Sequence, residues 1–140
     1  MIEIFAYGTL RDAEYQHALF GRVLPARPAV LAGWRVVVAE SGFFTIVPDP
    51  AASVAGDVVM LDDDALEIAD AWEDVPLYER LPVDVTADDG THVAAYVYVR
   101  PTASRERPPE NALAQHDRDI VLECIHAFRE AYVRTRSESA

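Results

Sequence analysis

The feature that most restricts the fold of this chain is a pair of alternating segments, residues 81–86 and 93–99, on either side of Asp89-Gly90. Apolar residues recur at every second position of the first segment, and the second places Ala94, Tyr96 and Tyr98 on one face. A period of two is typical of a β-strand, and Asp-Gly between two such runs favours a tight hairpin. We therefore predict an antiparallel hairpin at residues 81–99.

More segments rich in apolar and β-branched residues precede this hairpin, at residues 2–7, 29–39, 43–47 and 54–61. Such segments are typical of strands. Gly33 lies inside the second of them and predicts a β-bulge. Pro48 and Pro50 separate the last two, because proline cannot donate to a strand ladder. Strands therefore dominate the first hundred residues.

Helices are expected at the edges of this sheet. The first covers residues 14–20 and ends at Gly21. The second opens at residues 62–64, where Asp64 and Glu67 have the spacing of a capping box. The third covers about residues 112–134, and its apolar stripe contains Ile120, Cys124, Ala127, Phe128 and Ala131. The whole pattern predicts an α+β fold, with a mostly antiparallel sheet or small barrel and flanking helices. No repeat or linker divides the chain, so we expect a single domain over residues 1–140.

The charge of the chain is concentrated in one region. The formal net charge is −12, and residues 49–90 hold 13 acidic residues and one basic residue, Arg80. Such a surface repels phosphate groups, so we expect neither nucleic acid nor an anionic membrane as a partner. No apolar run approaches the ~20 residues that cross a bilayer. We interpret the acidic residues as a solvated surface, in preference to a device that attracts cationic substrates.

Cysteine and histidine usage argues against disulfides and metals. Cys124 is the only cysteine, and its place on an apolar helical stripe predicts a buried core residue. His17, His92, His116 and His126 lack the spacing of metal ligands. We therefore expect no metal and no cofactor. A chain without an internal disulfide or a recognisable signal peptide is expected in the cytoplasm.

The first candidate site is the turn after the opening strand, whose residues are Tyr7, Gly8, Thr9 and Leu10. Glycine permits a sharp turn that gathers successive backbone N–H groups, and a helix begins soon afterwards. Such a nest binds a carboxylate or an oxyanion. A glycine after a strand is more often only a turn, so the spacing by itself is a weak signal.

The second candidate is Glu73, near the end of the second helix. Pro76 prevents that helix from continuing, so Glu73 is expected in or just after its last turn. The negative end of the helix dipole and the nearby acids Asp70 and Asp74 disfavour its charged form. A carboxyl group with a raised pKa suits proton transfer near neutral pH. The plainer interpretation is a solvated surface acid paired with Arg80.

The order of several motifs resembles the γ-glutamylcyclotransferase-like (AIG2-like) family over residues 1 to about 100. The opening FAYGTLR at residues 5–11 is similar to the start of that family. Its proline segment, its V-x-G-E/D-V strand, its L-D-x-F-E and Y-x-R segment and its A-x-V-Y strand are matched at residues 46–50, 54–58, 69–80 and 93–99. Each motif is loose, and their order and spacing make the resemblance specific.

The resemblance implies a small mixed barrel with a cavity over the YGTL turn. It implies a cyclotransferase, which cleaves γ-glutamyl amides by attack of the substrate's own α-amine and releases 5-oxoproline and a free amine. Matched by position, Glu73 is the catalytic residue, Tyr7, Gly8, Thr9 and Leu10 bind the glutamyl moiety, and Tyr78 lines the cavity. A small γ-glutamyl compound is then the expected partner.

Two positions depart from the family pattern. Trp72 stands where phenylalanine is usual, and Phe44-Thr45 stands where an aromatic residue is often followed by proline. The last helix matches nothing in the family, and both a cap on the barrel and a homodimer interface stay open for it. For Tyr96 and Tyr98, lining the cavity and filling the barrel are equally open. The alternative function is a binding or regulatory module that keeps the cavity without turnover, because a fold does not fix a function.

Overall fold

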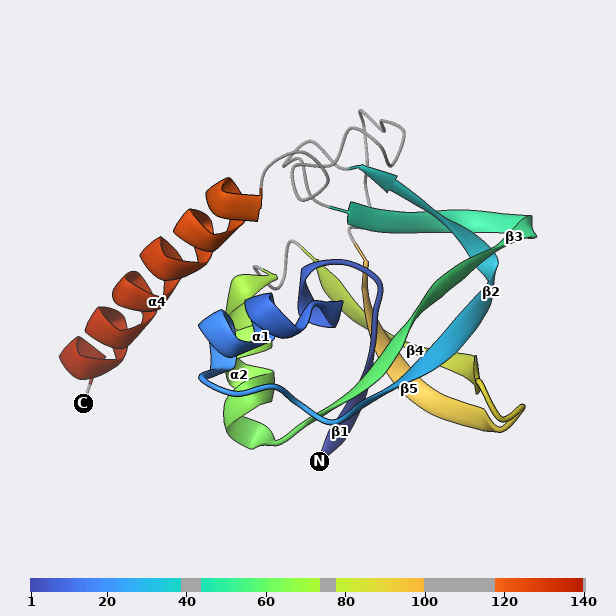
Figure 1. Cartoon of the computed structure of the whole chain (residues 1–140), viewed down its shortest axis with the longest axis horizontal. Coiled ribbons are helices and arrows are strands. Elements are labelled where there is room, and N and C mark those ends of the chain that lie inside the picture. Colours follow the sequence, from blue (N-terminus) through green and yellow to red (C-terminus); the bar gives the residue numbers. More distant parts are fainter. Residues whose placement is uncertain (39–43, 74–77, 100–117, 140) are drawn as a thin grey trace.

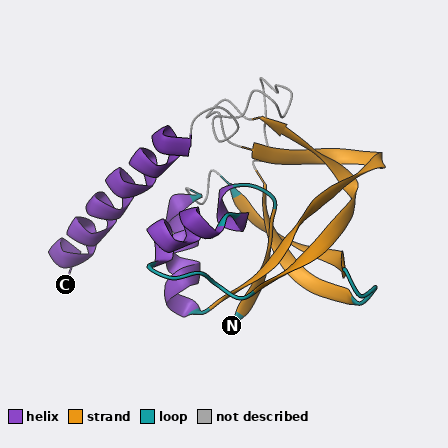
Figure 2. Ribbon diagram, in the orientation of Figure 1, coloured by secondary structure: helices purple, strands orange, loops and turns teal. Residues whose placement is uncertain are grey.

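The computed structural model describes residues 1–38, 44–73, 78–99 and 118–139. Five strands and three α-helices lie in these ranges, with one short 3₁₀ turn, η1, at Thr9–Arg11. The strands form one side of the molecule and the helices the other (Figures 1 and 2). The strands are β1 (Ile2–Ala6), β2 (Ala26–Val38), β3 (Phe44–Leu61), β4 (Glu79–Ala87) and β5 (His92–Val99). The helices are α1 (Ala13–Phe20), α2 (Asp63–Trp72) and α4 (Arg118–Ser139).

The strands close into a barrel in the order β1-β3-β2-β4-β5. All neighbours pair antiparallel except β1 and β5, which pair parallel with Ile4 opposite Tyr96 and close the barrel. Gly90, with φ of 86°, lies in the predicted hairpin between β4 and β5. The prediction of an α+β fold with a small mixed barrel and flanking helices is therefore confirmed.

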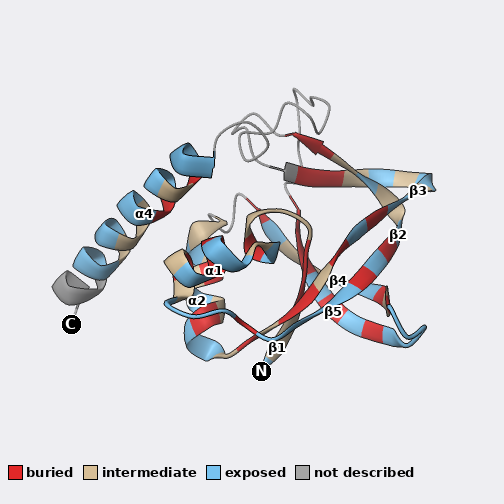
Figure 3. Cartoon of the chain, in the orientation of Figure 1, coloured by how far each residue is buried: buried red, intermediate tan, exposed pale blue. Residues whose placement is uncertain are grey.

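Two apolar cores lie on opposite faces of the barrel wall. The inner core contains Phe5 and the inward residues of the other strands, among them Val93, Ala95 and Val97. The outer core lies between the wall and the helices, and it contains Ile4, Tyr98 and buried residues of all three helices. Strand alternation divides the two sets, so buried and exposed residues interchange along the first part of β5 in Figure 3, whereas the end of β1 is buried on both faces. Tyr98 thus points outward, under the helices.

Of the predictions about strand irregularities, the bulge at Gly33 is confirmed and the break at Pro48 and Pro50 is wrong. The register between β2 and β3 shifts between Ala32 and Trp34, and Gly33 has φ of 88°, as its position predicts. The segments expected at residues 43–47 and 54–61 are one strand, β3, which runs through Pro48 and Pro50. Pro48 pairs with Trp34 directly beside this shift, where the regular ladder is interrupted. Proline is tolerated at such a place.

Local capping signals decide where the first two helices begin and end. Asp12 accepts hydrogen bonds from the amides of Glu14 and Tyr15, and α1 ends at Gly21 with φ of 76°. In α2 the capping residue is Asp62, which accepts from the Ala65 amide at 2.9 Å. The predicted capping box at Asp64 is therefore wrong, because the first of three consecutive aspartates takes the cap.

The last helix presents a different face to the core from the one predicted. Val121 and Ile125 are buried, whereas Ile120 is 41% exposed and Cys124 is exposed. The predicted burial of Cys124 is therefore wrong. Apolar and small residues occupy two adjacent stripes of α4, so spacing alone could not choose between them. Residues 112–117 of the predicted helix lie outside the described residues.

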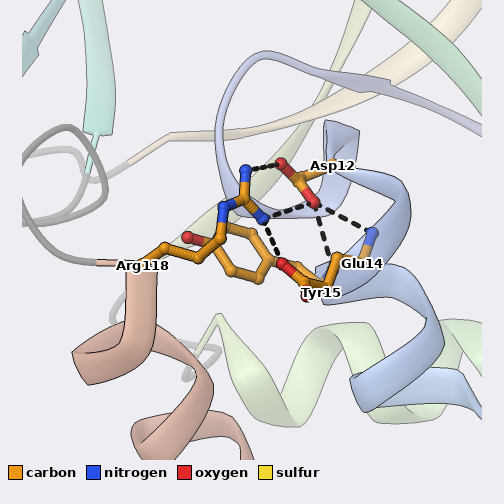
Figure 4. A network of polar contacts seen from close by, with 4 residues as sticks. All are labelled: Asp12, Glu14, Tyr15 and Arg118. Atoms are coloured by element: carbon orange, nitrogen blue, oxygen red, sulfur yellow. Dashed lines mark hydrogen bonds and ion pairs between the residues drawn. The ribbon is translucent and has the colours of Figure 1, made fainter.

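Arg118, at the start of α4, joins that helix to the beginning of α1 (Figure 4). Its guanidinium donates to both carboxylate oxygens of Asp12, at 3.1 and 2.6 Å, and to Glu14 at 2.7 Å. It also lies over the ring of Tyr15, 4.7 Å from the centroid. Hydrogen bonding to Arg118 lowers the pKa of Asp12 and keeps this helix cap ionised. Because Asp12 also caps α1, one carboxylate fixes both helix starts.

Candidate functional site

The predicted YGTL turn lies where β1 leaves the barrel wall. Tyr7 follows β1 directly, and Gly8 precedes the η1 turn. The Arg11 amide donates to the Gly8 carbonyl at 3.0 Å, and the Asp12 amide to the Thr9 carbonyl at 3.2 Å. The amides of Thr9 and Leu10 come before the first amide that the turn itself uses. The turn therefore has the N–H end that an anion would need.

Tyr7 ties this turn to the neighbouring strand. Its hydroxyl donates to the backbone carbonyl of Tyr98 at 2.5 Å, across the junction of β1 and β5. Burial, and then the negative charge of Glu73, raise the pKa of Tyr7 well above its usual value. The phenol therefore stays protonated and remains a hydrogen-bond donor.

Glu73 ends α2, as its position before Pro76 predicts. It is the C-terminal cap, with φ of −76° and ψ of −3°, and its amide donates to the Ala69 carbonyl at 2.9 Å. The residue keeps part of its surface in contact with solvent, yet burial of its carboxyl group raises its pKa from 4.5 to about 8. The expected direction of the shift holds. Its cause is burial, in place of the helix dipole and neighbouring acids on which the sequence argument relied.

The interpretation of Glu73 as a solvated partner of Arg80 is wrong. Arg80 lies 2.9 Å from a carboxylate oxygen of Asp70, one helical turn before Glu73. Desolvation at Glu73 and this separate pairing of Arg80 leave a carboxyl group that changes charge near neutral pH.

The negative charge of Glu73 acts on two nearby tyrosine side chains. The charge of Glu73 contributes, after burial, to the raised pKa values of both Tyr7 and Tyr98. Tyr78, which is 6% exposed, also raises the pKa of Tyr7. Tyr7 thus lies within the electrostatic influence of both Glu73 and Tyr78, and Gly8, Thr9 and Leu10 follow Tyr7 on the same turn. Three separate parts of the chain supply one cluster.

Two further members of the cluster are Asp70, which was not singled out from the sequence as a site residue, and Tyr98, for which the sequence left lining the cavity and filling the barrel equally open. The Tyr98 hydroxyl donates to Asp70 at 2.5 Å, and burial followed by this bond raises the pKa of Tyr98. Asp70 had been considered only as an acidic neighbour. The signal for it was its separation of three residues from Glu73, which places both on one helix face. The signal for Tyr98 was its alternation with the buried valines of β5.

Metal binding and membrane crossing find no support in the part of the chain that is described. No group of histidine, cysteine, aspartate or glutamate side chains there could hold a metal ion. None of the described helices is both long and apolar enough to cross a bilayer. What the cluster does offer is a titratable carboxyl group, neutral phenols and the N–H end of a turn. This set suits proton transfer on a substrate that carries a carboxylate.

Comparison with known families decides the membership of the chain. The family model described as "Gamma-glutamyl cyclotransferase, AIG2-like" matches residues 4–118. The chain belongs to this family. The match contains every predicted site residue, and it ends where α4 begins.

Individual relatives agree with this assignment. AIG2-like protein C of Arabidopsis thaliana is 35% identical over 101 residues, which are 69% of this chain and 58% of that protein. The solved structure of a γ-glutamyl cyclotransferase has a TM-score of 0.67 at 19% identity, covering 90% of this chain and 86% of its own. A solution structure of another Arabidopsis thaliana protein has a TM-score of 0.66 at 23% identity, with 96% and 87% covered. At these identities the two structures support the fold.

The buried carboxyl group of Glu73 predicts a specific dependence of stability on pH. Its pKa is higher in the folded state, so between about pH 4.5 and 8 the folded state keeps a proton that the unfolded state has lost. Stability should therefore fall as pH rises through this window, by up to about 1.4 kcal/mol per pH unit, and level off above it. Glu73→Gln lacks this titration, so its Tm should exceed that of the wild type increasingly from pH 5 to 8.

Thermal melting of both proteins across this range measures the effect. Asp64→Asn, which changes an exposed acid in the same helix, is the matched control and should follow the wild-type curve. If the Tm of Glu73→Gln and that of the wild type differed by the same amount at every pH from 5 to 8, the Glu73 carboxyl group would be ionised throughout this range.

Proposed function

We propose that this protein is a cyclotransferase that cleaves γ-glutamyl amides by intramolecular attack of the α-amine and releases 5-oxoproline and a free amine. The observation that carries the proposal is the buried Glu73 carboxyl group, whose pKa of about 8 lets it both accept and return a proton near neutral pH. Its position beside Tyr7 places this group next to the turn that would hold the substrate.

The first step is deprotonation of the substrate. A γ-glutamyl compound carries an α-ammonium group, which is not a nucleophile until it loses a proton. Ionised Glu73 takes that proton, and the free amine attacks the γ-carbonyl carbon of the same molecule. Because nucleophile and carbonyl are already joined, the protein needs only to hold the conformer that closes a five-membered ring.

The second step is collapse of the tetrahedral intermediate. The bond between the γ-carbon and the departing nitrogen breaks, and protonated Glu73 delivers its proton to that nitrogen. The proton removed from the ammonium group has then moved to the leaving amine, and the carboxyl group is ready for another cycle. The ring nitrogen loses one of its two remaining hydrogens as the lactam forms, and this proton also passes to the released amine, which leaves as an ammonium ion. No water is consumed and no residue is acylated.

The turn would hold the substrate, and the phenols would line the place where it lies. The leading amides of Thr9 and Leu10 suit the substrate's α-carboxylate or the oxyanion that forms on the γ-carbonyl. Tyr7 and Tyr98 are kept neutral by their raised pKa values, so they add no negative charge near the carboxylate. Their O–H groups donate to the Tyr98 carbonyl and to Asp70, which holds both rings in place beside the substrate. Tyr78 supplies buried aromatic surface beside Tyr7. None of these roles calls for a metal or cofactor.

The linkage of the substrate gives a test of this chemistry. The five-membered ring closes only when the scissile amide is at the γ-carbonyl, so γ-glutamyl amides should yield 5-oxoproline, and α-glutamyl peptides should stay intact. Mass spectrometry on a panel of matched γ- and α-linked compounds measures both. Release of free glutamate would mean that water is the nucleophile, and the proposed cyclisation would be wrong.

Substitution of the carboxyl group tests its role directly. Glu73→Gln should lower kcat by roughly 10²- to 10⁴-fold, the range for general acid/base catalysis, which equals about 3–5 kcal/mol of barrier. KM should change little, because the YGTL turn is intact. In the wild type kcat/KM should rise with pH towards about 8, since the ionised carboxylate is the base, and the variant should lose this rise.

The control for this experiment follows from the structure. Asp70 is unsuitable because it binds Tyr98 and Arg80, and Asp74 lies outside the described residues. Asp64→Asn, on the exposed start of α2, should retain full turnover. A folded Glu73→Gln protein with wild-type kcat would favour the alternative, a module that binds a ligand without turning it over.

A further inference from the structure

Gln16 is a buried polar side chain in an apolar environment. It is 2% exposed, and the surrounding core contains Leu10, Tyr15, Leu19 and Leu24. Burial of an amide side chain is unfavourable unless its donor and acceptor are both paired. A leucine would fill this space without that requirement. The presence of glutamine therefore calls for a reason other than packing.

Its two hydrogen bonds supply that reason. The Nε2 group donates to the Leu10 carbonyl at 2.7 Å, and Oε1 accepts from the Leu24 amide at 3.0 Å. Leu10 and Leu24 are each 4% exposed, so water has little access to either residue. The partners also fix the orientation of the side-chain amide, because one is an acceptor and the other a donor. Gln16 thus joins α1 to the last residue of the YGTL turn.

This contact completes the immobilisation of the turn. The carbonyls of Gly8, Thr9 and Leu10 accept from the Arg11 amide, the Asp12 amide and Gln16 respectively. Each peptide group is planar and trans, so fixing a carbonyl also fixes the N–H on its opposite side. The held carbonyls of Gly8 and Thr9 set the directions of the Thr9 and Leu10 amides. The held Leu10 carbonyl fixes the direction of the Arg11 N–H, and the hydrogen bond from that N–H holds the Gly8 carbonyl.

We propose that Gln16 is a positioning residue for substrate binding: by holding the Leu10 carbonyl it orients the Arg11 amide, which holds the Gly8 carbonyl and so fixes the direction in which the Thr9 amide binds the glutamyl moiety. The inference rests on the proposed function, because it takes the Thr9 amide as a substrate contact. The side-chain hydrogen bonds of Gln16 go to backbone groups of Leu10 and Leu24, so it acts through the turn.

The helix that carries Gln16 is itself anchored. Asp12 caps α1 four residues before Gln16, and Arg118 of α4 holds Asp12 with two hydrogen bonds (Figure 4). Leu19, on the same helix, is fully buried in the core that receives α2 and α4. The glutamine therefore projects from a rigid element, as a positioning role requires.

The test compares Gln16→Glu with Leu19→Ala on one confirmed substrate. The glutamate keeps the size and the acceptor for Leu24, and it loses the donor to Leu10 only above the pKa of the new carboxyl group, which burial raises. The comparison is therefore made at a pH above about 8. Leu19→Ala destabilises the same helix by removing packing and leaves the turn's hydrogen bonds in place. We expect Gln16→Glu to raise KM about tenfold or more. In Gln16→Met, which adds no titratable group, the pH profile should keep the wild-type midpoint because Glu73 is untouched.

The control and the outcomes separate positioning from simple destabilisation. Leu19→Ala should lower the Tm by a similar or larger amount and leave KM within about twofold of the wild type, since no contact of the turn is lost. Gln16→Met, which removes both hydrogen bonds without burying a charge, should raise KM as Gln16→Glu does. Equal KM values for the glutamine variants and Leu19→Ala would overturn the proposal.

A measurement on the wild type covers the case in which the Gln16 variants do not fold. The Gln16 side-chain NH₂ protons, followed by NMR, should exchange with solvent far more slowly than those of an exposed amide, and they should shift when 5-oxoproline binds. Rapid exchange without ligand would overturn the proposal. The exchange rate needs no turnover, so it is readable even if no γ-glutamyl compound reacts, a result that would instead count against the proposed function.

Discussion

The parallel pairing of β1 with β5 is the contact on which the rest of the structure depends. It closes the barrel, and it sets the end of β1 beside the strand that carries Tyr98. The Tyr7 hydroxyl then reaches the Tyr98 carbonyl and holds the start of the turn that follows β1. Gly56 permits the close approach of β3 on the other side, because a Cβ there would collide with the Ala6 carbonyl and the Phe5 ring. Without closure of the barrel, Tyr7 and Tyr98 would not lie next to each other.

The helices complete the site by enclosing a group that would prefer water. α2 ends at Glu73 above the outer face of the wall, where Tyr98 and Tyr78 belong to the surrounding buried core. Burial raises the pKa of Glu73 and makes a neutral carboxyl group the stable form below about pH 8. Burying Glu73 lowers the stability of the folded protein, and it yields a carboxyl group that can exchange protons at physiological pH. Such shifted pKa values are usual at sites that perform chemistry. The core that costs Glu73 its solvation also orders the YGTL turn.

Local signals in the sequence predicted much of the fold, and contacts between distant segments account for what it missed. The β4–β5 hairpin, the bulge at Gly33 and the end of α1 at Gly21 each follow from a few neighbouring residues. The continuity of β3 through its prolines, and the face that α4 buries, depend on partners far along the chain. In the site, Glu73 and the turn were predicted from position and from family resemblance. The roles of Asp70 and Gln16 were not, because their partners are brought close only by the folded barrel and helices.

The protonation of Glu73 is the central claim, and it can be measured directly. Infrared difference spectra of wild type minus Glu73→Gln, recorded as a pH titration, isolate the carbonyl stretch of one protonated carboxyl group from all others. The structure predicts a band that persists through neutral pH and disappears with a midpoint near 8, since burial holds the proton on the group. A midpoint near 4.5, the ordinary value for glutamate, would show that Glu73 is solvated and would remove the basis for its proposed role.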